Sequence, residues 1–298
     1  NLVEFILRNG DLESGGTAGD KEAMLKGSRL HRKIQKQMGS HYQAEVSLKK
    51  DTEYEDLILR VEGRADGIFT QNEKICIDEI KGVYKNLELL AEPVLVHRAQ
   101  ALCYAWIYLD DHGLEEIDVQ MTYAHLDTEM IKRFRETMTR EELESWYQRL
   151  LDSYHKWLSY QMKWREERNR SMEKLEFPFI YRKGQKEMVA GIYHAISRKE
   201  QIFIQAPTGV GKTMSAVFPA VRSIGEGKAE TLFYLTARTI TRTVAQDAFE
   251  ILRKNGLLFK TVTITAKEKL CFCEKPECNP ETCPYAKGHY DRINDAVY

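Results

Sequence analysis

The sequence has no long apolar run, no signal peptide and almost no net charge. Because a membrane span needs about 18 or more consecutive apolar residues, we expect no membrane-spanning segment and a cytoplasmic location. Its 44 basic and 45 acidic residues leave a net charge of −1, so any contact with nucleic acid must come from a local basic groove. The chain begins with Asn1 rather than Met, which suggests a fragment of a longer protein.

Cysteine is also scarce, but its distribution is uneven. Cys76 and Cys103 stand alone within strongly patterned segments, which is typical of small buried apolar residues. The other four crowd into one short stretch, as Cys271, Cys273, Cys278 and Cys283. In a chain without signs of secretion, this cluster predicts metal ligation rather than disulfides. Four thiolates can hold zinc or a [4Fe–4S] cluster, and spacing alone does not separate the two.

The first part of the chain, residues 1–130, alternates helix and strand patterns, which predicts an α/β fold. Met24, Leu30 and Ile34 form one apolar stripe of a helix over residues 21–38. Strands are predicted over 43–50, 56–69 (bent or split at Gly63), 74–81 and 116–124, with a helix from Pro93 to Leu109.

A densely charged stretch follows, and we interpret residues 131–176 as a bridge. Trp146, Leu150, Trp157 and Trp164 are interspersed over residues 135–170, which predicts one or two long amphipathic helices. Their aromatic rings could stack on nucleic-acid bases, but packing is the simpler interpretation.

The third part, residues 177–270, shows the strand–turn–helix–strand opening of a P-loop nucleotide-binding fold. The predicted elements are helices over 183–197, from Lys212, and over 240–254, with strands over 201–205, 231–235 and 261–264. Residues 271–298 form a separate cysteine segment.

Two short patterns combine glycine with a polar residue in the first part. Gly27 precedes His31 by one helical turn, so both lie on one helix face, where glycine lets another backbone approach. Asp66 stands between Gly63 and Gly67 within a strand pattern. Each pattern is common by itself, and a lone histidine is more often solvated or capped than a ligand.

Two further patterns place an acid, a lysine and polar helical residues in sequence. Side chains alternate along a strand, so Glu79 and Lys81 project from one face. This pair suits phosphodiester hydrolysis, because the carboxylate binds a divalent metal and the lysine orients or polarises the attacking water. Gln100 and Tyr104, with His97 one turn earlier, share a helical stripe that would face the site or DNA.

The ordered set resembles the RecB-type branch of the PD-(D/E)xK nucleases over about residues 20–125. The resemblance implies a mixed sheet flanked by helices, and cleavage of DNA with Mg²⁺ or Mn²⁺. It implies metal ligation by His31, Asp66, Glu79 and the Ile80 carbonyl, action of Lys81 on the water, and support of the site or binding of DNA by Gln100 and Tyr104. Ala65 stands where the family name has proline, as is common in this branch, and Glu45 fits an acidic position near the site.

The third part carries a P-loop, APTGVGKT, at residues 206–213. A glycine turn between a strand and a helix aims backbone N–H groups at phosphate. Thr208, Gly209 and Gly211 would form the turn, Lys212 would reach the β- and γ-phosphates, and Thr213 would hold Mg²⁺. Arg182 and Gln185 precede the first helix, as in adenine-contacting Q motifs.

The P-loop with Ala206, the strand-following Thr236–Thr239 and the cysteines together resemble the XPD/DinG family of superfamily 2 helicases over residues 177–298. The resemblance implies a partial RecA-like lobe, 5′→3′ movement on single-stranded DNA, and an inserted [4Fe–4S] domain that helps separate the duplex. Here the cysteines are closer together than is usual in the family, which leaves open that Cys271 or Cys273 is a bystander, and zinc is the alternative metal.

We therefore expect a DNA helicase–nuclease that uses ATP. No Asp-Glu-x-His box, second lobe or arginine finger is found, so this chain alone is expected not to unwind DNA and to bind ATP poorly. The alternatives are a nuclease with a clamp-like motor half, a DNA-binding protein with vestigial sites, and an unrelated P-loop enzyme such as a small-molecule kinase.

Overall fold

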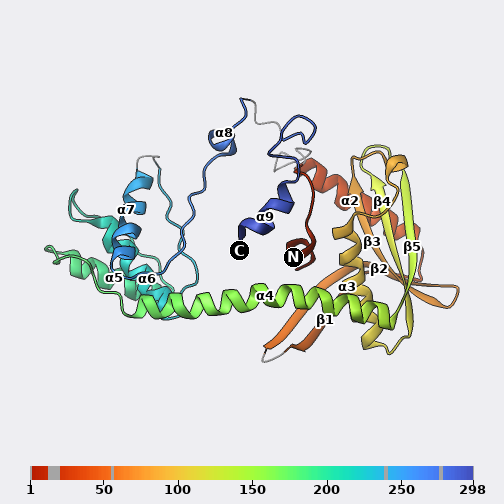
Figure 1. Cartoon of the computed structure of the whole chain (residues 1–298), viewed down its shortest axis with the longest axis horizontal. Helices are drawn as coiled ribbons and strands as arrows, with labels where there is room; N and C mark the ends of the chain where they lie inside the picture. Colours follow the sequence, from red (N-terminus) through yellow and green to blue (C-terminus); the bar gives the residue numbers. More distant parts are fainter. Residues whose placement is uncertain (1, 13–20, 55–56, 238–240, 275–277, 298) are drawn as a thin grey trace. The chain divides into compact units, whose positions relative to one another are not determined.

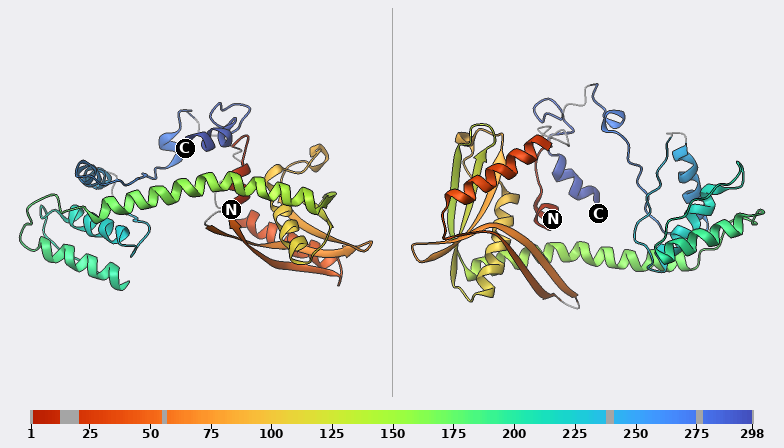
Figure 2. Two further views of the ribbon diagram at one scale, coloured as in Figure 1. Left: turned by 60° about the horizontal axis from the view of Figure 1, so that its bottom comes forward. Right: turned by 180° about the vertical axis from the view of Figure 1, so that it is seen from behind.

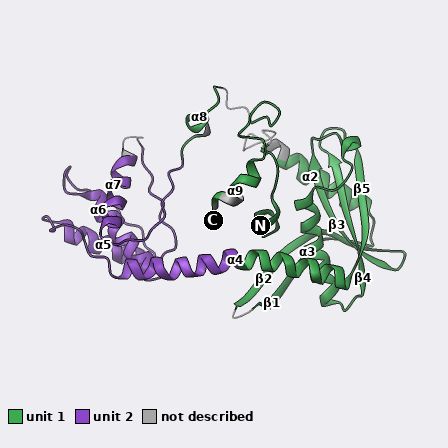
Figure 3. Ribbon diagram, viewed as in Figure 1, with its two compact units in different colours: residues 1–155, 265–298 green, residues 156–264 purple. Residues whose placement is uncertain are grey.

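The computed structural model describes residues 2–12, 21–54, 57–237, 241–274 and 278–297. The chain divides into two compact units (Figure 3). Unit 1 comprises residues 1–155 and 265–298, and unit 2 comprises residues 156–264. Helix α4 (Arg140–Glu173) begins in unit 1 and ends in unit 2. In the part of the chain that the structure describes, no helix is both long and apolar enough to cross a membrane.

Unit 1 is built on one mixed sheet of five strands in the order β1-β2-β3-β4-β5. Strands β3 and β4 are parallel, and every other neighbouring pair is antiparallel. The strands are β1 (Tyr42–Tyr54), β2 (Leu57–Gln71), β3 (Lys74–Val83), β4 (Glu116–His125) and β5 (Ile131–Thr139). The mixed α/β fold and the four strands predicted in this part are confirmed.

Two helices flank this sheet and position the candidate site (Figure 1). In α2 (Lys21–Gln37), Leu30 and Ile34 pack against Ile80 of β3 and Ala124 of β4. Helix α3 (Leu95–Asp111) contacts β1 to β4 and is reached by Lys81, which lies next to Ile80 in the strand. Since neighbouring side chains of a strand point to opposite faces, the two helices cover opposite faces of β3.

The hairpin of β1 and β2 separates from the rest of the sheet partway along its length. The β1–β2 ladder runs from Tyr42 paired with Phe69 to Tyr54 paired with Leu57. The β2–β3 ladder covers only residues 67–71 of β2, ending where Gly67 pairs with Asp78. Beyond this point β1 and β2 extend together as a two-stranded arm (Figure 2). The sheet therefore forks at the Gly67–Asp78 pair, and residues 57–66 of β2 lie in the arm.

Some details of unit 1 differ from the sequence prediction. Met24, expected on the buried stripe of α2, is 76% exposed, and β2 runs through Gly63 without a break. Residues 131–139 form strand β5 rather than the start of a bridging helix. Their dense charge conceals an alternation of period two, and the edge strand is supported by the ion pairs of Arg135 with Asp118 and Glu136 with Arg98.

Unit 2 is held together by helices. The end of α4 packs with α5 (Gln185–Arg198), α6 (Lys212–Gly225) and α7 (Thr241–Lys254). Their common core contains Met172, Leu175, Val189, Met214, Val217, Phe218, Val221, Ile224, Ala248, Phe249, Leu252 and Leu257. The three helices that the sequence predicts for this part are confirmed.

The three strands predicted for unit 2 are not formed. Residues 201–205, 231–235 and 261–264 are described, and none of them lies in a strand. An extended segment becomes a strand only when a neighbour satisfies its N–H and C=O groups, and these segments do not pair with one another here. Most of their apolar side chains are exposed, most of all Phe203 at 94%, whereas Leu232 packs against the core of unit 2.

Candidate functional site

Asp66 and Glu79 lie opposite each other at the fork of the sheet. They occupy the next position beyond the last β2–β3 pair, which is Gly67 with Asp78. Because side chains alternate along each strand, the side chains of Asp66 and Glu79 share one face. In place of a ladder bond, the Ile80 N–H donates to Asp66 Oδ2 at 2.7 Å. The sequence suggested the Ile80 carbonyl as a metal ligand, whereas the contact seen here is through its N–H.

Helix α2 brings His31 to the same carboxylate. His31 Nδ1 lies 3.6 Å from Asp66 Oδ1. One turn later, Gln35 donates from Nε2 to the Asp66 carbonyl at 2.9 Å and to Glu45 Oε1 at 3.0 Å. Glu45 also pairs with Arg64 at 2.7 Å. The sequence reasoning missed Gln35, although its spacing of four residues from His31 was a usable signal.

Lys81 connects strand β3 to helix α3. Its ammonium donates to Glu79 Oε1 at 2.7 Å and to Gln100 Oε1 at 3.0 Å. Gln100 in turn donates from Nε2 to the Tyr104 hydroxyl at 3.1 Å. A Cβ at Gly63 would lie 2.6 Å from Cε1 of Tyr104, so the Tyr104 ring lies directly against β2. These contacts fix the Lys81 ammonium from two sides.

Glu79 is the most deeply buried charged group of this cluster. Its side chain is 2% exposed, and its Oε2 has no hydrogen-bond partner. Burial raises the pKa of Glu79 to about 7, and the nearby Lys81 ammonium opposes the rise. A buried carboxylate oxygen without a partner is costly unless a cation compensates it. The free Oε2 and the neighbouring Asp66 and His31 therefore fit a divalent cation in their donor chemistry.

The spacing within this cluster is not that of a closed metal site. Among the described residues, no group of three or more His, Cys, Asp or Glu side chains stands close enough together to hold an ion. Glu79 Oε1 is instead directed to the Lys81 ammonium. The structure thus brings His31, Asp66, Glu79 and Lys81 into one connected set, with the carboxylates bonded to protein donors.

His97 lies one turn before Gln100 and has its own partners. Its Nδ1 is 3.2 Å from the Tyr123 hydroxyl, which also accepts the Val94 N–H at 2.9 Å. Burial lowers the pKa of His97 to about 4, and the charges of Lys81 and Lys85 contribute. His97 is therefore neutral near pH 7, and its contact with Tyr123 joins the start of α3 to β4.

Strand β3 approaches α2 at Gly27, because a Cβ added at Gly82 would lie 3.7 Å from Gly27 Cα. A Cβ at Gly27 itself would meet nothing within 4 Å, so glycine is not required there. The tight positions are on the strands: a Cβ at Gly67 would lie 1.8 Å from the Tyr42 ring, and one at Gly82 would lie 2.7 Å from Leu126. The glycines that close packing requires are therefore in β2 and β3 rather than in α2.

The P-loop of unit 2 has a shaped backbone. Gly209 and Gly211 have φ of +84° and +79°, values that favour glycine. Lys212 opens α6 and donates from Nζ to the carbonyls of Ala206 at 3.0 Å and Pro207 at 2.8 Å. Thr208 is exposed. The loop thus curls around the lysine ammonium.

The residues of the predicted Q motif contact this loop. The buried Gln185 donates from Nε2 to the Val210 carbonyl at 3.1 Å and accepts the Arg182 N–H at 3.0 Å. The Arg182 guanidinium donates to the Gly209 carbonyl. Thr213 is half-buried in the first turn of α6. Of the predicted motif at residues 236–239, Arg238 and Thr239 lie outside the described residues.

The four clustered cysteines gather in unit 1. Cys278 and Cys283 are buried with Ala286, and Cys273 packs against them. Cys273 Sγ lies 3.8 Å from Cys283 Sγ. The hydrogen bond with Cys283 raises the pKa of the Cys273 thiol to about 11, with a smaller contribution from Cys271. Two thiolates about 2.3 Å from one tetrahedral metal are about 3.8 Å apart, whereas a cubane cluster places each thiolate on a different iron.

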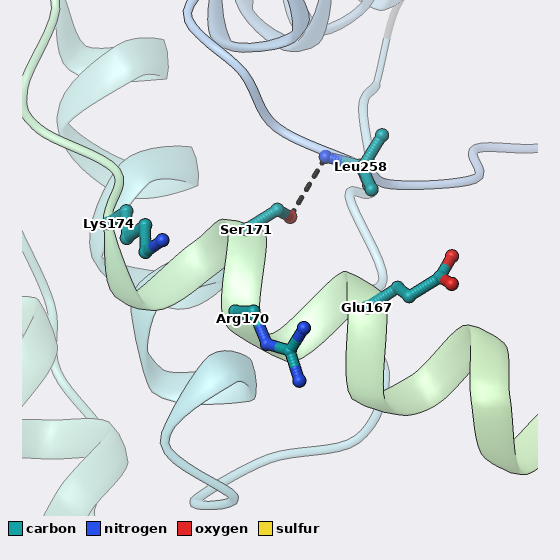
Figure 4. A pocket seen from close by; sticks show the side chains of 5 residues that line it. All are labelled: Glu167, Arg170, Ser171, Lys174 and Leu258. Atoms are coloured by element: carbon teal, nitrogen blue, oxygen red, sulfur yellow. Dashed lines mark hydrogen bonds between the residues drawn. The ribbon is translucent and has the colours of Figure 1, made fainter.

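A shallow hollow of about 270 Å³ lies in unit 2, near the end of α4 (Figure 4). It is lined by Glu167, Arg170, Ser171, Lys174 and Leu258. The Leu258 N–H donates to Ser171 Oγ at 3.0 Å across it. None of the predicted site residues lines this hollow, so it has no part in the functional assignment.

Among the comparisons with known proteins, the family match lies in the second half of the chain. Residues 182–274 match the family model for DEAD/DEAH box helicases. A probable ATP-dependent helicase of Methanocaldococcus jannaschii is 43% identical over 49 residues, which is 16% of this chain and 7% of that protein. The solved structure of the protein SSO0001 aligns with 44% of this chain and 61% of its own, at 20% identity and a TM-score of 0.34. That structural likeness is too weak to bear on fold or function.

Proposed function

We propose that this chain combines a divalent-metal-dependent DNA nuclease with part of an ATP-driven DEAD/DEAH-type helicase motor. The observation that carries the nuclease half is the buried Glu79, whose free Oε2 lies in a connected set with Asp66, His31 and Lys81. The helicase half rests on the match of residues 182–274 and on the P-loop geometry.

Each nuclease residue has a distinct role in this proposal. Asp66, Glu79 and His31 would hold Mg²⁺ or Mn²⁺ at the fork of the sheet. When bound, the metal supplies Lewis-acid stabilisation of the phosphate and lowers the pKa of a coordinated water. Lys81 orients the attacking water and neutralises charge on the phosphate. Gln100 holds the Lys81 ammonium in place through its Oε1.

Two features of the site keep that arrangement rigid. Tyr104 hydrogen-bonds Gln100 from the same helix, and its ring abuts Gly63. The Ile80 N–H anchors Asp66 Oδ2. Catalytic groups held by such contacts lose less entropy on reaching the reactive geometry. Asp66 is therefore restrained by strand β3, and Lys81 by helix α3.

In the motor half, Lys212 would exchange its two carbonyl partners for phosphate oxygens of ATP. Thr213 would hold Mg²⁺, and Thr208, Gly209 and Gly211 would surround the phosphates with N–H groups. Gln185 and Arg182 would contact adenine in addition to donating hydrogen bonds to the carbonyls of the loop. Movement 5′→3′ on single-stranded DNA follows from the XPD/DinG resemblance and belongs to this proposal.

The cysteine segment is proposed to be a four-thiolate metal centre. The XPD/DinG resemblance implies [4Fe–4S], with zinc as the alternative; among the described residues the four cysteines do not stand close enough together to form a ready metal site, and the contact of Cys273 with Cys283 is a thiol hydrogen bond. Metal analysis with absorbance separates the two: an iron–sulfur protein is brown and absorbs near about 400 nm, and a zinc protein is colourless. Cys283→Ser is expected to lose the metal in either case.

The nuclease proposal is tested by digestion of end-labelled single- and double-stranded DNA with Mg²⁺ or Mn²⁺. Lys81→Ala should lower cleavage at least about 100-fold while leaving DNA binding largely unchanged. The matched control is Lys74→Ala, at the other end of β3, where Lys74 pairs with Glu116 on the surface. Unchanged cleavage by Lys81→Ala, or metal-independent cleavage by the wild type, would remove this mechanism.

A nuclease with a clamp-like motor half is the competing function. The observation that favours it is that residues 201–205, 231–235 and 261–264, which the sequence predicts as strands, do not pair into a sheet. ATP hydrolysis measured with and without single-stranded DNA separates the two functions. Stimulation by DNA supports a motor, and its absence supports a clamp.

A further inference from the structure

Three aromatic side chains form a stripe on the part of α4 that belongs to unit 2. Trp157, Tyr160 and Trp164 are spaced by three and four residues, which places them on one helix face. The Trp157 and Tyr160 rings are stacked, with centroids 5.6 Å apart. Tyr160 is 37% exposed, Trp157 and Trp164 are half-buried, and the described core of unit 2 contains none of the three. The aromatic stripe is therefore a partly exposed surface of this unit.

A lysine from a distant segment lies over the aromatic stripe. Lys260 Nζ is 5.0 Å from the centroid of the Tyr160 ring and 4.8 Å from that of the Trp164 ring, and it donates to the Tyr160 hydroxyl at 2.6 Å. Its segment is attached to the same helix, because the Leu258 N–H donates to Ser171 Oγ (Figure 4). A cation is attracted to the face of an aromatic ring, so the rings hold the Lys260 ammonium at this surface.

Lys260 differs from another lysine of unit 2 that lies over a ring. Lys228 Nζ is 4.1 Å from the centroid of the Tyr193 ring, and it also pairs with Glu226 at 2.6 Å. The contacts described for Lys260 are with the two rings and the Tyr160 hydroxyl, and none of them is with a carboxylate. Lys260 is exposed. Its charge is therefore available to an anion from outside the chain.

The chain around the aromatic stripe carries an excess of positive charge. Residues 156–174 contain six basic and three acidic residues, a net charge of +3, in a chain whose net charge is −1. Cations that meet phosphates, together with rings that stack on bases, are the combination that binds single-stranded nucleic acid. An acidic peptide would match the charge but would have no flat groups to place on a row of rings. The aromatic stripe therefore favours a nucleic acid as the partner.

We propose that the aromatic stripe and Lys260 form a binding surface for single-stranded DNA, in which bases stack on the rings and the Lys260 ammonium binds a phosphate. This inference rests on the proposed function for its DNA substrate, but the surface requires neither a metal ion nor ATP. Because every base has a flat face, stacking tolerates any sequence. A duplex keeps its base faces in its interior and should bind this surface more weakly.

The first test measures binding of a short fluorescent deoxyadenylate strand to the whole chain in EDTA, which prevents metal-dependent cleavage. Trp164→Ala should weaken binding at least about 5-fold. Trp164→Phe, which keeps a ring for stacking, should retain most of the affinity. The matched control is Trp146→Ala, because Trp146 lies on the same helix but in unit 1, and this variant should bind as the wild type does.

The second test isolates the phosphate contact and uses an exposed position, where the substitution leaves the fold intact. Lys260→Ala should weaken binding and lower the slope of log affinity against log salt concentration by about 0.7, the value for one phosphate contact on a single strand. The matched control is Lys228→Ala, because the charge of Lys228 is already paired with Glu226. Its salt slope should equal that of the wild type.

A third readout separates stacking from charge in the wild-type chain. An abasic strand of the same length keeps the phosphates but lacks the bases, and it should bind at least about 5-fold more weakly. Photocrosslinking with a strand that contains iodouracil should label the peptide of residues 157–164. Equal binding of the abasic strand, or tighter binding of polyglutamate at this surface, would assign it to another anionic partner and overturn the inference.

Two outcomes separate this inference from the proposed function. A wild type that binds no single-stranded DNA overturns both. A wild type that binds single-stranded DNA, but whose affinity is unchanged by Trp164→Ala and by Lys260→Ala, overturns the inference alone.

Discussion

Apolar extended segments occur in both units, but only unit 1 pairs them into a sheet. In β3, Ile77 is 0% exposed and lies between β2 and β4. In unit 2, Phe203 stands in a comparable apolar run and is almost fully exposed. In unit 1 three strand pairs are antiparallel neighbours along the chain, and the parallel pair β3–β4 is joined by a crossover through α3. In unit 2 the segments predicted as strands do not pair with one another.

The candidate sites of the two units differ in the same way. In unit 1 the side chains of Glu79, Lys81 and Gln100 bond to one another across strand and helix. In unit 2 Lys212 bonds only to carbonyls of its own loop, among the contacts described. A site carried on a finished sheet is organised before its ligand arrives. In unit 2 the loop is contacted by Gln185 and Arg182, but the Lys212 ammonium has no side-chain partner among the contacts described.

The largest expected effect on this comparison is on stability. Ile77→Ala removes a fully buried side chain and should lower the free energy of unfolding of unit 1 by about 2–5 kcal/mol. Phe203→Ala, at an exposed position, should change that of unit 2 by no more than about 0.5 kcal/mol. Hydrogen exchange over a urea series reports the two units separately. Equal losses in both would mean that Phe203 is packed in solution.

The pH dependence of unit 1 should reveal the buried His97. Its pKa in the folded protein is about 4, below the ordinary 6.5, so the unfolded chain binds the proton more readily. The contribution of His97 to the free energy of unfolding should therefore fall as pH drops from about 6.5 to 4, by at most about 3.4 kcal/mol at 1.36 kcal/mol per pKa unit. Glu79, whose pKa is raised to about 7, contributes with the opposite sign over an overlapping interval, so the contribution of His97 is read as a difference between wild type and variant.

His97→Gln, which keeps a polar partner for Tyr123 without titrating, is the matched variant for that slope. The free energy of unfolding of the wild type, relative to that of this variant, should fall as pH drops over the same interval, measured by urea unfolding at several pH values. An identical slope in wild type and variant would assign the acid sensitivity to another group.

The smallest of these effects concerns the glycines at the fork. Gly63→Ala places a methyl 2.6 Å from Cε1 of Tyr104 and should cost about 1–3 kcal/mol through overpacking. Gly27→Ala meets nothing within 4 Å in a helix and should stabilise it by up to about 1 kcal/mol. Thermal unfolding of both variants measures the difference. A stable Gly63→Ala protein would show that Tyr104 moves freely.

Much of unit 1 was predictable because its patterns are local. Alternation identified β1 to β4, and the resemblance to RecB-type nucleases indicated which polar residues meet. Strand β5 escaped prediction because charge concealed its alternation, and Gln35 because its amide acts on a backbone carbonyl. The loss of the strand around Phe203 was not predictable, since a sequence pattern shows that a segment can pair but not whether a partner is present.

The central claim is that His31, Asp66 and Glu79 share one divalent cation beside Lys81. Calorimetric titration of the wild-type chain with Mn²⁺, compared with Glu79→Gln and with the surface control Glu116→Gln, tests it most directly. We predict one Mn²⁺ site per chain at the fork, weakened at least about 10-fold in Glu79→Gln and unchanged in Glu116→Gln. A wild type that does not bind Mn²⁺, or a Glu79→Gln chain that binds it equally well, would contradict the account.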